Sequence, residues 1–180
     1  IVSEIKKIGA KRISCAGSLR RGKETVGDID ILCCGGAGGE ITSRFVKLPQ
    51  VDTVIAAGRT KASVRLKAGI QCDIRVIAED SFGAALQYFT GSKEHNVALR
   101  ELALKRGYSL SEYGLFRVSD KKRKRPVAAK TEDEIYAMLG LKLIPPEIRE
   151  NTGEIEAAAG RALPSLLEES DVRGDLHNHT

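Results

Sequence analysis

The sequence is poor in aromatic residues, which make up 4% of its 180 residues, and it contains no tryptophan. This shortage argues against a broad platform on which the bases of a single strand could stack. Long hydrophobic runs are also lacking, and no run approaches the roughly 20 apolar residues that a membrane-spanning helix needs. No secretory signal is visible either, so we expect no membrane partner.

Charge of neither sign dominates, because 29 basic residues stand against 24 acidic ones, giving a net charge of +5. A mildly basic balance is compatible with a polyanionic partner but does not require one. The four cysteines lie in apolar contexts and show no C-x-x-C spacing: Cys15, Cys33, Cys34 and Cys72. We expect reduced, buried thiols and a cytoplasmic protein.

The most informative segment is residues 17–32, which opens with a Gly-Ser turn and two arginines and closes on an apolar run that contains Asp28 and Asp30. Residues two apart on a strand point to the same face, so the two carboxylates lie roughly 6–7 Å apart along the backbone. Such a pair suits two divalent ions, Mg²⁺ or Mn²⁺, that support displacement at phosphorus. The turn and the arginines offer donors for phosphate oxygens. The segment therefore predicts a nucleotidyltransferase.

A third carboxylate, Asp73, lies on the strand-like run 71–77. Alternation places Asp73 and Arg75 on one face and the apolar residues on the other. If this strand lies beside the one that carries Asp28 and Asp30, the three carboxylates converge, and metal cations would neutralise their repulsion. The alternative is that Asp73 begins a solvated edge and pairs with Arg75 or Arg65.

The remaining pattern predicts an α+β protein with a mixed, largely antiparallel sheet. We expect a helix over 1–8, strands over 11–16 and 27–34, a helix over 40–48 and three antiparallel strands over 52–57, 62–66 and 71–77. Helices follow over 81–89 and 93–106, then short strands over 108–118 and 127–129. Thr131 and Glu134 indicate a capping box at the start of another helix, and an alanine-rich helix is expected over 152–163.

Three motifs in this order resemble family X DNA polymerases, the polymerase-β-like group. The first is the GS…RRG…GDID pattern of residues 17–30, the second is YFTGS at 88–92, and the third is the Glu-Tyr pair Glu112-Tyr113. The resemblance covers roughly residues 13–145. It implies a nucleotidyltransferase palm over 1–79, a small α+β thumb over 80–148 and a linker over 149–180.

The resemblance also implies a role for each matching residue. Two Mg²⁺ or Mn²⁺ ions would bind Asp28, Asp30 and Asp73, and Asp73 would accept the proton of the primer 3′-hydroxyl. A dNTP would be held through its triphosphate, sugar and base by Ser18, Arg21, Gly27, Tyr88, Phe89, Gly91 and Asn96. Arg100 would face the template of a gapped primer–template DNA, and Arg75 would switch between the third carboxylate and Glu112 to control closure.

Several of these residues also have simpler interpretations. Tyr88 and Phe89 could be the core end of a helix, and Asn96 and Arg100 could be ordinary surface residues. We expect Arg20 to face solvent or DNA, and His95 to be an unremarkable residue on a helix surface.

Two further segments are charged or rich in histidine. The run 121–125 begins with Lys121, Lys122 and Arg123, and it would either contact duplex phosphates or remain a solvated loop. Residues 174–180 resemble the opening of a PHP phosphoesterase domain, in which His177 and His179 would bind a metal. We expect a fragment of a longer protein with only the start of that domain, and hence no exonuclease activity from this piece.

The expected function is therefore template-directed DNA synthesis in gap-filling repair by a monomeric enzyme. Two alternatives remain: a different nucleotidyltransferase built on the same palm, or a fragment that binds DNA weakly or is inactive.

Overall fold

The computed structural model describes residues 1–120, 122 and 125–174, and its largest element is a five-stranded sheet with the order β1-β2-β5-β4-β3. The strands are β1 (Arg12–Cys15), β2 (Asp28–Cys34), β3 (Val51–Ala57), β4 (Lys61–Leu66) and β5 (Gln71–Ile77). All neighbouring pairs are antiparallel except β2 and β5, which are parallel. The expected mixed, largely antiparallel sheet is confirmed.

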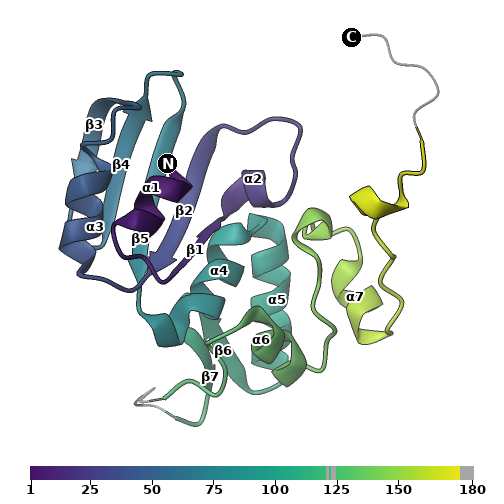
Figure 1. Ribbon diagram of the computed structural model, residues 1–180. Helices are drawn as coiled ribbons and strands as arrows, with labels where there is room; N and C mark the ends of the chain where they lie inside the picture. Colours follow the sequence, from purple (N-terminus) through teal and green to yellow (C-terminus); the bar gives the residue numbers. More distant parts are fainter. Residues whose placement is uncertain (121, 123–124, 175–180) are drawn as a thin grey trace.

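One face of the sheet is covered by α1 (Val2–Lys7) and α3 (Gly38–Phe45) (Figure 1). Their apolar side chains, including Ile5 and Phe45, pack on Ile31 of β2 and Ile74 of β5, and all four are at most 2% exposed. Alternation along β2 and β5 sends these residues to one side, which leaves the aspartates of both strands for the other side.

The opposite face is shared between a polar end and an apolar end. Over the carboxyl-terminal part of β2, Leu32 and Cys34 are buried against Phe82 and Ala85 of α4 (Phe82–Thr90). The short helix α2 (Gly17–Arg20) follows β1 and lies against β2. Because α4 covers only one end of this face, Asp28 and Asp30 lie at the open end, with Asp28 exposed.

The second part of the chain has its own core. It contains α5 (Lys93–Lys105), the hairpin β6 (Tyr108–Ser111) and β7 (Gly114–Arg117), α6 (Glu132–Met138) and α7 (Glu154–Ala159). Leu99, Leu115, Ile135 and Tyr136 are fully buried in that core. The described residues also contain three single-turn 3₁₀ helices: η1 (Glu79–Ser81), η2 (Pro146–Ile148) and η3 (Glu169–Asp171).

Side-chain caps begin two of the helices. The Ser92 hydroxyl accepts a hydrogen bond from His95 N at the start of α5, and the Thr131 hydroxyl accepts one from Glu134 N at the start of α6. The capping box expected at Thr131 is only half formed, because the Glu134 carboxylate accepts from Lys130 N instead of the Thr131 amide.

Two expected elements are shorter than the pattern indicated. The strand expected over 127–129 is a single bridge between Leu115 and Ala128, and the helix expected over 152–163 is limited to α7. The α+β class is nevertheless confirmed. Of the helices in the described part of the chain, none has the length and apolarity to cross a membrane.

The four cysteines are all free thiols, and three of them are buried. Burial raises the pKa of Cys33 to about 11 and that of Cys72 to about 12, so both stay protonated in the core. The expectation of reduced, buried thiols holds for Cys33, Cys34 and Cys72, whereas Cys15 is half-buried.

Candidate active site

Asp30 and Asp73 lie directly opposite each other on the parallel strands β2 and β5. Asp28 is two residues before Asp30 on the same face. Asp73 is only 8% exposed, and Arg75 is the next residue of β5 on the same face. The expected placement of the third carboxylate beside the first two is thus present, and the solvated-edge alternative for Asp73 is wrong, since β5 has β2 on one side and β4 on the other.

The pKa values of the two opposed aspartates are shifted in opposite directions. Burial raises the pKa of Asp30, and the negative charges of Asp28 and Asp73 raise it further. Burial also acts to raise the pKa of Asp73, but hydrogen bonds from Gln71 and Ser63 and the charge of Lys61 outweigh it and lower the pKa. Arg75 and Lys61 offset the effect of these negative charges on Asp30 only in part, so a further positive charge nearby would relieve the repulsion that remains.

Contacts with Asp73 come from both its own strand and its neighbour. Gln71 Nε2 donates to Asp73 Oδ1 at 2.9 Å, and Lys61 Nζ of β4 lies 3.3 Å from Asp73 Oδ2. Both carboxylate oxygens are thus occupied. Across the described ranges, no three His, Cys, Asp or Glu side chains are placed together as a metal centre.

The donor chemistry of the three aspartates nevertheless fits a hard divalent cation, which prefers carboxylate oxygens. Arg75 and Lys61 offset the repulsion of Asp30 by Asp28 and Asp73 only in part, and the repulsion that remains favours that fit. For Asp73 to bind a cation, the Lys61 ammonium has to withdraw. Which residues bind metal remains a prediction.

The Gly-Ser turn forms α2, and its glycine is required by the neighbouring carboxylate. Gly17 has φ +60°, and a Cβ added there would lie 2.5 Å from Asp30 Oδ2. Only glycine combines this backbone conformation with so close an approach. Ser18, half-buried, follows in the same turn, while Gly27 is exposed immediately before β2.

Arg21 reaches from the end of α2 to the YFTGS segment. Its Nη1 donates to the Thr90 carbonyl at 2.6 Å, and its Nε donates to Glu150 Oε1 at 2.8 Å. At Gly91, where φ is +73°, an added Cβ would lie 3.0 Å from Arg21 Nη1, so glycine leaves room for the guanidinium. Arg21 borders a cavity of about 320 Å³ whose other lining residues are Tyr88, Phe89, Thr90, Gly91, Lys93, Asn96 and Arg100.

Most of the residues expected to bind the nucleotide therefore line one cavity. Asn96 is fixed within it, because its Nδ2 donates to the Tyr88 carbonyl at 2.7 Å and its Oδ1 accepts from Gln87. The exposed Arg100 lies one turn further along α5, with Nε donating to Asn96 O. Tyr88 and Phe89 are only half-buried and contact each other edge to face, so they are not simply core residues.

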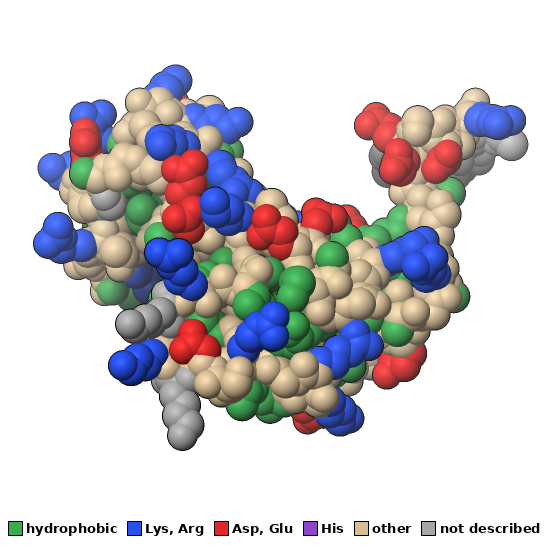
Figure 2. Space-filling view, turned by 90° about the horizontal axis from the view of Figure 1, so that it is seen from below, with side chains coloured by type: hydrophobic (Ala, Val, Ile, Leu, Met, Phe, Trp, Pro, Cys, Tyr) green, Lys and Arg blue, Asp and Glu red, His purple; other side chains and the backbone are tan. Residues whose placement is uncertain are grey.

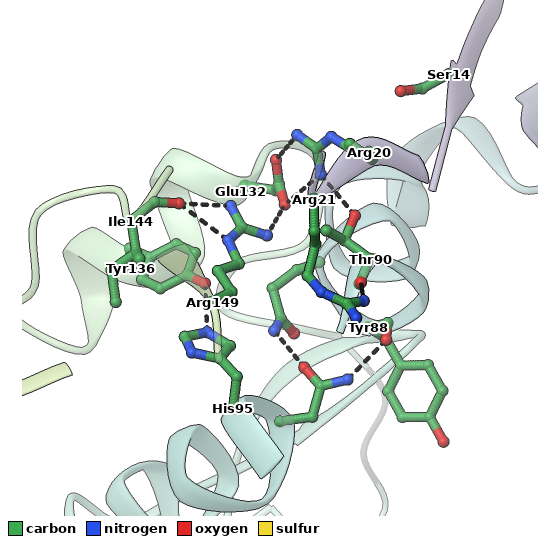
Figure 3. Close-up of polar contacts among 12 residues, drawn as sticks. Ser14, Arg20, Arg21, Tyr88, Thr90, His95, Glu132, Tyr136, Ile144 and Arg149 are labelled. Atoms are coloured by element: carbon green, nitrogen blue, oxygen red, sulfur yellow. Dashed lines mark hydrogen bonds and ion pairs between the residues drawn. The ribbon is translucent and has the colours of Figure 1, made fainter. Parts of the chain in front are cut away.

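The expectation for Arg20 is wrong. Its guanidinium forms a two-pronged ion pair with Glu132 of α6, at 2.9 and 2.6 Å, and donates to the Thr90 hydroxyl at 2.7 Å (Figure 3). The side chain is 20% exposed. Arg20 thus links α2 to α4 and α6. The buried carboxylate on α6 requires positively charged partners, and the local sequence could not reveal that Arg20 is one of them.

Glu132 has a second arginine partner, which is completely buried. Arg149 Nη1 donates to Glu132 Oε1 at 2.6 Å, and its Nε and Nη2 donate to the Ile144 carbonyl (Figure 3). Burial acts to raise the pKa of Glu132, but Arg20 and Arg149 outweigh it and lower the pKa. We did not anticipate Glu132 from the sequence, although it precedes Ile135 and Tyr136 by three and four residues and therefore shares their buried face.

The expectation for His95 is also wrong, because the side chain is fully buried. Its Nδ1 lies 2.6 Å from Glu154 Oε1 and its Nε2 lies 2.9 Å from the Tyr136 hydroxyl. Burial lowers the pKa of His95, and the hydrogen bond with Glu154 offsets this only in part. Leu99 and Ala103 follow at intervals of four residues and are buried too, so the helical spacing itself placed His95 on the buried stripe.

Neither of the two pairings expected for Arg75 is present in the part of the chain that the structure describes. Its guanidinium carbon lies 4.4 Å from the centre of the Phe89 ring, and its Nε is buried without a hydrogen-bond partner. Arg75 and Glu112 line the same cavity of about 270 Å³, together with Tyr113. The switch therefore remains a prediction.

Some expected residues lie outside the described residues, namely Lys121, Arg123, His177 and His179. Lys122 is described and exposed, with its backbone N–H donating to Asp120. On the face drawn in Figure 2, the Lys and Arg side chains of the described residues are scattered and do not form one continuous basic patch.

Comparisons with known proteins agree with this geometry. Residues 85–150 match the family model for the DNA polymerase beta thumb. The chain is 40% identical to the DNA polymerase/3′-5′ exonuclease PolX of Bacillus subtilis (strain 168) over 171 residues, which is 94% of the chain and 29% of that protein. It is 29% identical to DNA polymerase lambda of Rattus norvegicus over 77% of the chain and 28% of that protein. It is 35% identical to DNA-directed DNA/RNA polymerase mu of Homo sapiens over 57% of the chain and 20% of that protein.

These relationships place the chain among DNA polymerase sequences. Within that class they support a relationship to family X, the polymerase-β-like group, and the part that matches the thumb model is residues 85–150. The chain spans less than a third of the length of each of these relatives.

Proposed function

We propose that this chain carries the catalytic palm and the thumb of a template-directed DNA polymerase that acts in gap-filling repair. The palm is residues 1–79, the thumb is 80–148, and residues 149–180 form a linker after the thumb. The reaction joins the α-phosphate of a dNTP to a primer 3′-hydroxyl and releases pyrophosphate.

The observation that supports this most strongly is the pairing of Asp30 with Asp73 beneath the Gly17 turn. Three carboxylates on one face repel one another unless a cation is bound among them. We propose that Asp28, Asp30 and Asp73 hold two Mg²⁺ or Mn²⁺ ions there. Bound at these carboxylates, the ions would polarise the phosphate and stabilise the attacking and leaving oxygens.

The chain's own residues would perform the remaining steps. Asp73, whose pKa is lowered despite burial, is ionised at neutral pH and can accept the proton of the primer 3′-hydroxyl. Ser18, Arg21 and Gly27 would bind the triphosphate, where fixed donors stabilise the charge that develops on the leaving oxygen.

The nucleoside would occupy the cavity bordered by Arg21. Tyr88, Phe89 and Gly91 would pack against the sugar, and Asn96, whose amide is fixed by Gln87 and the Tyr88 carbonyl, would face the nascent base pair. Arg100 would contact the template strand. The 270 Å³ cavity lined by Arg75 and Glu112 would close as the thumb moves.

We further propose that the partner is gapped primer–template DNA, bound in part by phosphate contacts from Lys121, Lys122 and Arg123. The protein would act as a monomer. The buried free thiols support a reducing compartment such as the cytoplasm.

Primer extension across a one-nucleotide gap tests the proposal, with Mg²⁺ and Mn²⁺ in parallel. Asp30→Ala and Asp73→Asn should each lower the extension rate by at least about a hundredfold, because each removes a charge on which ion binding depends. Asp52→Ala is the matched control, since Asp52 is exposed on the edge strand β3 and should leave the rate within about twofold.

Two outcomes would contradict the proposal. If Asp30→Ala retains full activity, the carboxylates are not the metal site. If the unaltered protein binds gapped DNA but extends no primer in either metal, the chain is a DNA-binding segment without catalysis of its own.

A further inference from the structure

A fixed carboxylate, Glu150, lies beside the arginine that faces the nucleotide cavity. Glu150 Oε1 accepts a hydrogen bond from Arg21 Nε at 2.8 Å, and Lys23 Nζ lies 3.5 Å from the same oxygen. The side chain of Arg21 is 14% exposed and that of Glu150 is 28% exposed. Because water is partly excluded, this pair is stronger than an ordinary surface ion pair.

The backbone next to Glu150 is held in place by other contacts. The preceding residue, Arg149, is completely buried and bonds through its side chain to Glu132 and the Ile144 carbonyl. The Arg149 carbonyl also accepts a hydrogen bond from Ser92 N, next to the YFTGS glycine. Glu150 is therefore held on the thumb side of Arg21 by contacts that do not involve Arg21.

Besides its bond to Glu150, Arg21 has a second hydrogen bond and lies at the edge of two cavities. Nη1 bonds to the Thr90 carbonyl, and the side chain borders the 320 Å³ cavity on one side and a second cavity of about 300 Å³, with Lys23 and Thr25, on the other. A polyanion that enters either cavity meets Arg21, and one that enters the second cavity also meets Lys23, while both cations are already paired with Glu150.

We propose that Glu150 is a built-in competing anion that weakens the binding of triphosphate and pyrophosphate groups at Arg21 and Lys23. The inference rests on the proposed function, in which Arg21 binds the dNTP triphosphate. The carboxylate offsets part of the positive charge and repels the ligand, and it acts on the nucleotide and on the pyrophosphate product alike. Glu150 acts through Arg21 and Lys23, and it takes no part in bond formation.

The test is Glu150→Gln, which removes the charge but keeps an oxygen that can accept from Arg21 Nε. KM for dATP in gap filling and Kd for inorganic pyrophosphate should both fall about three- to tenfold, as expected for removing a fixed charge several ångströms from a polyanion in a partly screened site. The kcat value should change by less than about twofold. Glu156→Gln, an exposed carboxylate on α7, is the charge-matched control.

A second variant separates competition from mere support. If Glu150 only holds Arg21 in position, Glu150→Ala should raise KM for dATP. If Glu150 competes with the ligand, KM for dATP should fall in both Glu150→Gln and Glu150→Ala. Unchanged pyrophosphate affinity in Glu150→Gln would overturn the inference even if no extension were measurable. Arg21→Ala distinguishes the two levels: if it leaves dATP affinity unchanged, the proposed nucleotide site is wrong, and if it weakens dATP while Glu150→Gln changes nothing, only this inference fails.

Discussion

Two arginines adjacent in sequence, Arg20 and Arg21, have separate partners in the structure. Arg20 pairs with the buried Glu132, whereas Arg21 pairs with the more exposed Glu150 and faces the nucleotide cavity. Helical geometry explains the difference, since neighbouring residues on α2 point about 100° apart. At the residue scale, one arginine belongs to the buried network around Glu132 and the other borders the nucleotide cavity.

Glu132 gives the sharpest stability prediction at this scale. Glu132→Gln should destabilise the fold by about 3–5 kcal/mol, because the buried Arg149 guanidinium and Arg20 both lose their carboxylate. Urea unfolding followed by circular dichroism measures the loss. Asp133→Asn, one residue on and exposed, should change the free energy of unfolding by less than about 0.5 kcal/mol. Equal effects of the two variants would contradict a role for the buried network.

At the scale of elements, three buried side chains that contact one another in series link α7, α5 and α6. His95 on α5 lies between Glu154 on α7 and Tyr136 on α6. Glu154 also accepts hydrogen bonds from the backbone of Asn151 and Thr152, so it fixes the loop that precedes α7. The residue after His95 is Asn96, and the segment 149–154 therefore helps to fix the helix end that lines the nucleotide cavity.

This connection predicts a pH dependence of stability. The pKa of His95 is lowered in the fold from the ordinary value of 6.5, so the unfolded chain binds a proton that the folded chain does not. Stability is therefore fully present above pH 6.5 and is lost as the pH falls towards the lowered pKa, by at most about 1.4 kcal/mol per pH unit. Urea unfolding between pH 7.5 and 5.5 should show this slope, and His95→Gln should flatten it. An unchanged slope in that variant would assign the effect to other groups.

At the scale of the whole molecule, two cores meet across α2 and α4. The sheet packs on α1 and α3, the thumb packs around Tyr136, and α4 contacts both β2 and α6 (Figure 1). The Arg20–Glu132 pair spans the junction. A ligand that binds at this junction should therefore stabilise both parts together.

A thermal-shift experiment tests this expectation. Mn²⁺ and a dNTP together, at about a hundred times Kd, should add about 2.7 kcal/mol to the free energy of unfolding and raise Tm by roughly 5–10 °C. Either ligand alone should have a smaller effect, since the carboxylates and Arg21 bind opposite ends of the same complex. Asp30→Ala should abolish the joint shift. A shift of equal size in that variant would place the ligands elsewhere.

The strands and most helices could be predicted from the amino-acid order, because their apolar periods and caps are local. The same local alternation put Asp28 and Asp30 on one face, and it indicated Asp73 correctly as their neighbour. The partners of the charged and titratable groups, in contrast, depend on the folded arrangement. The Arg20–Glu132, Arg21–Glu150 and His95–Glu154 pairs join residues 59 to 129 apart in the chain, and burial gives those pairs their strength. No local pattern carries that information, since an ion pair depends on which surfaces the fold brings together and on how much water it leaves between them.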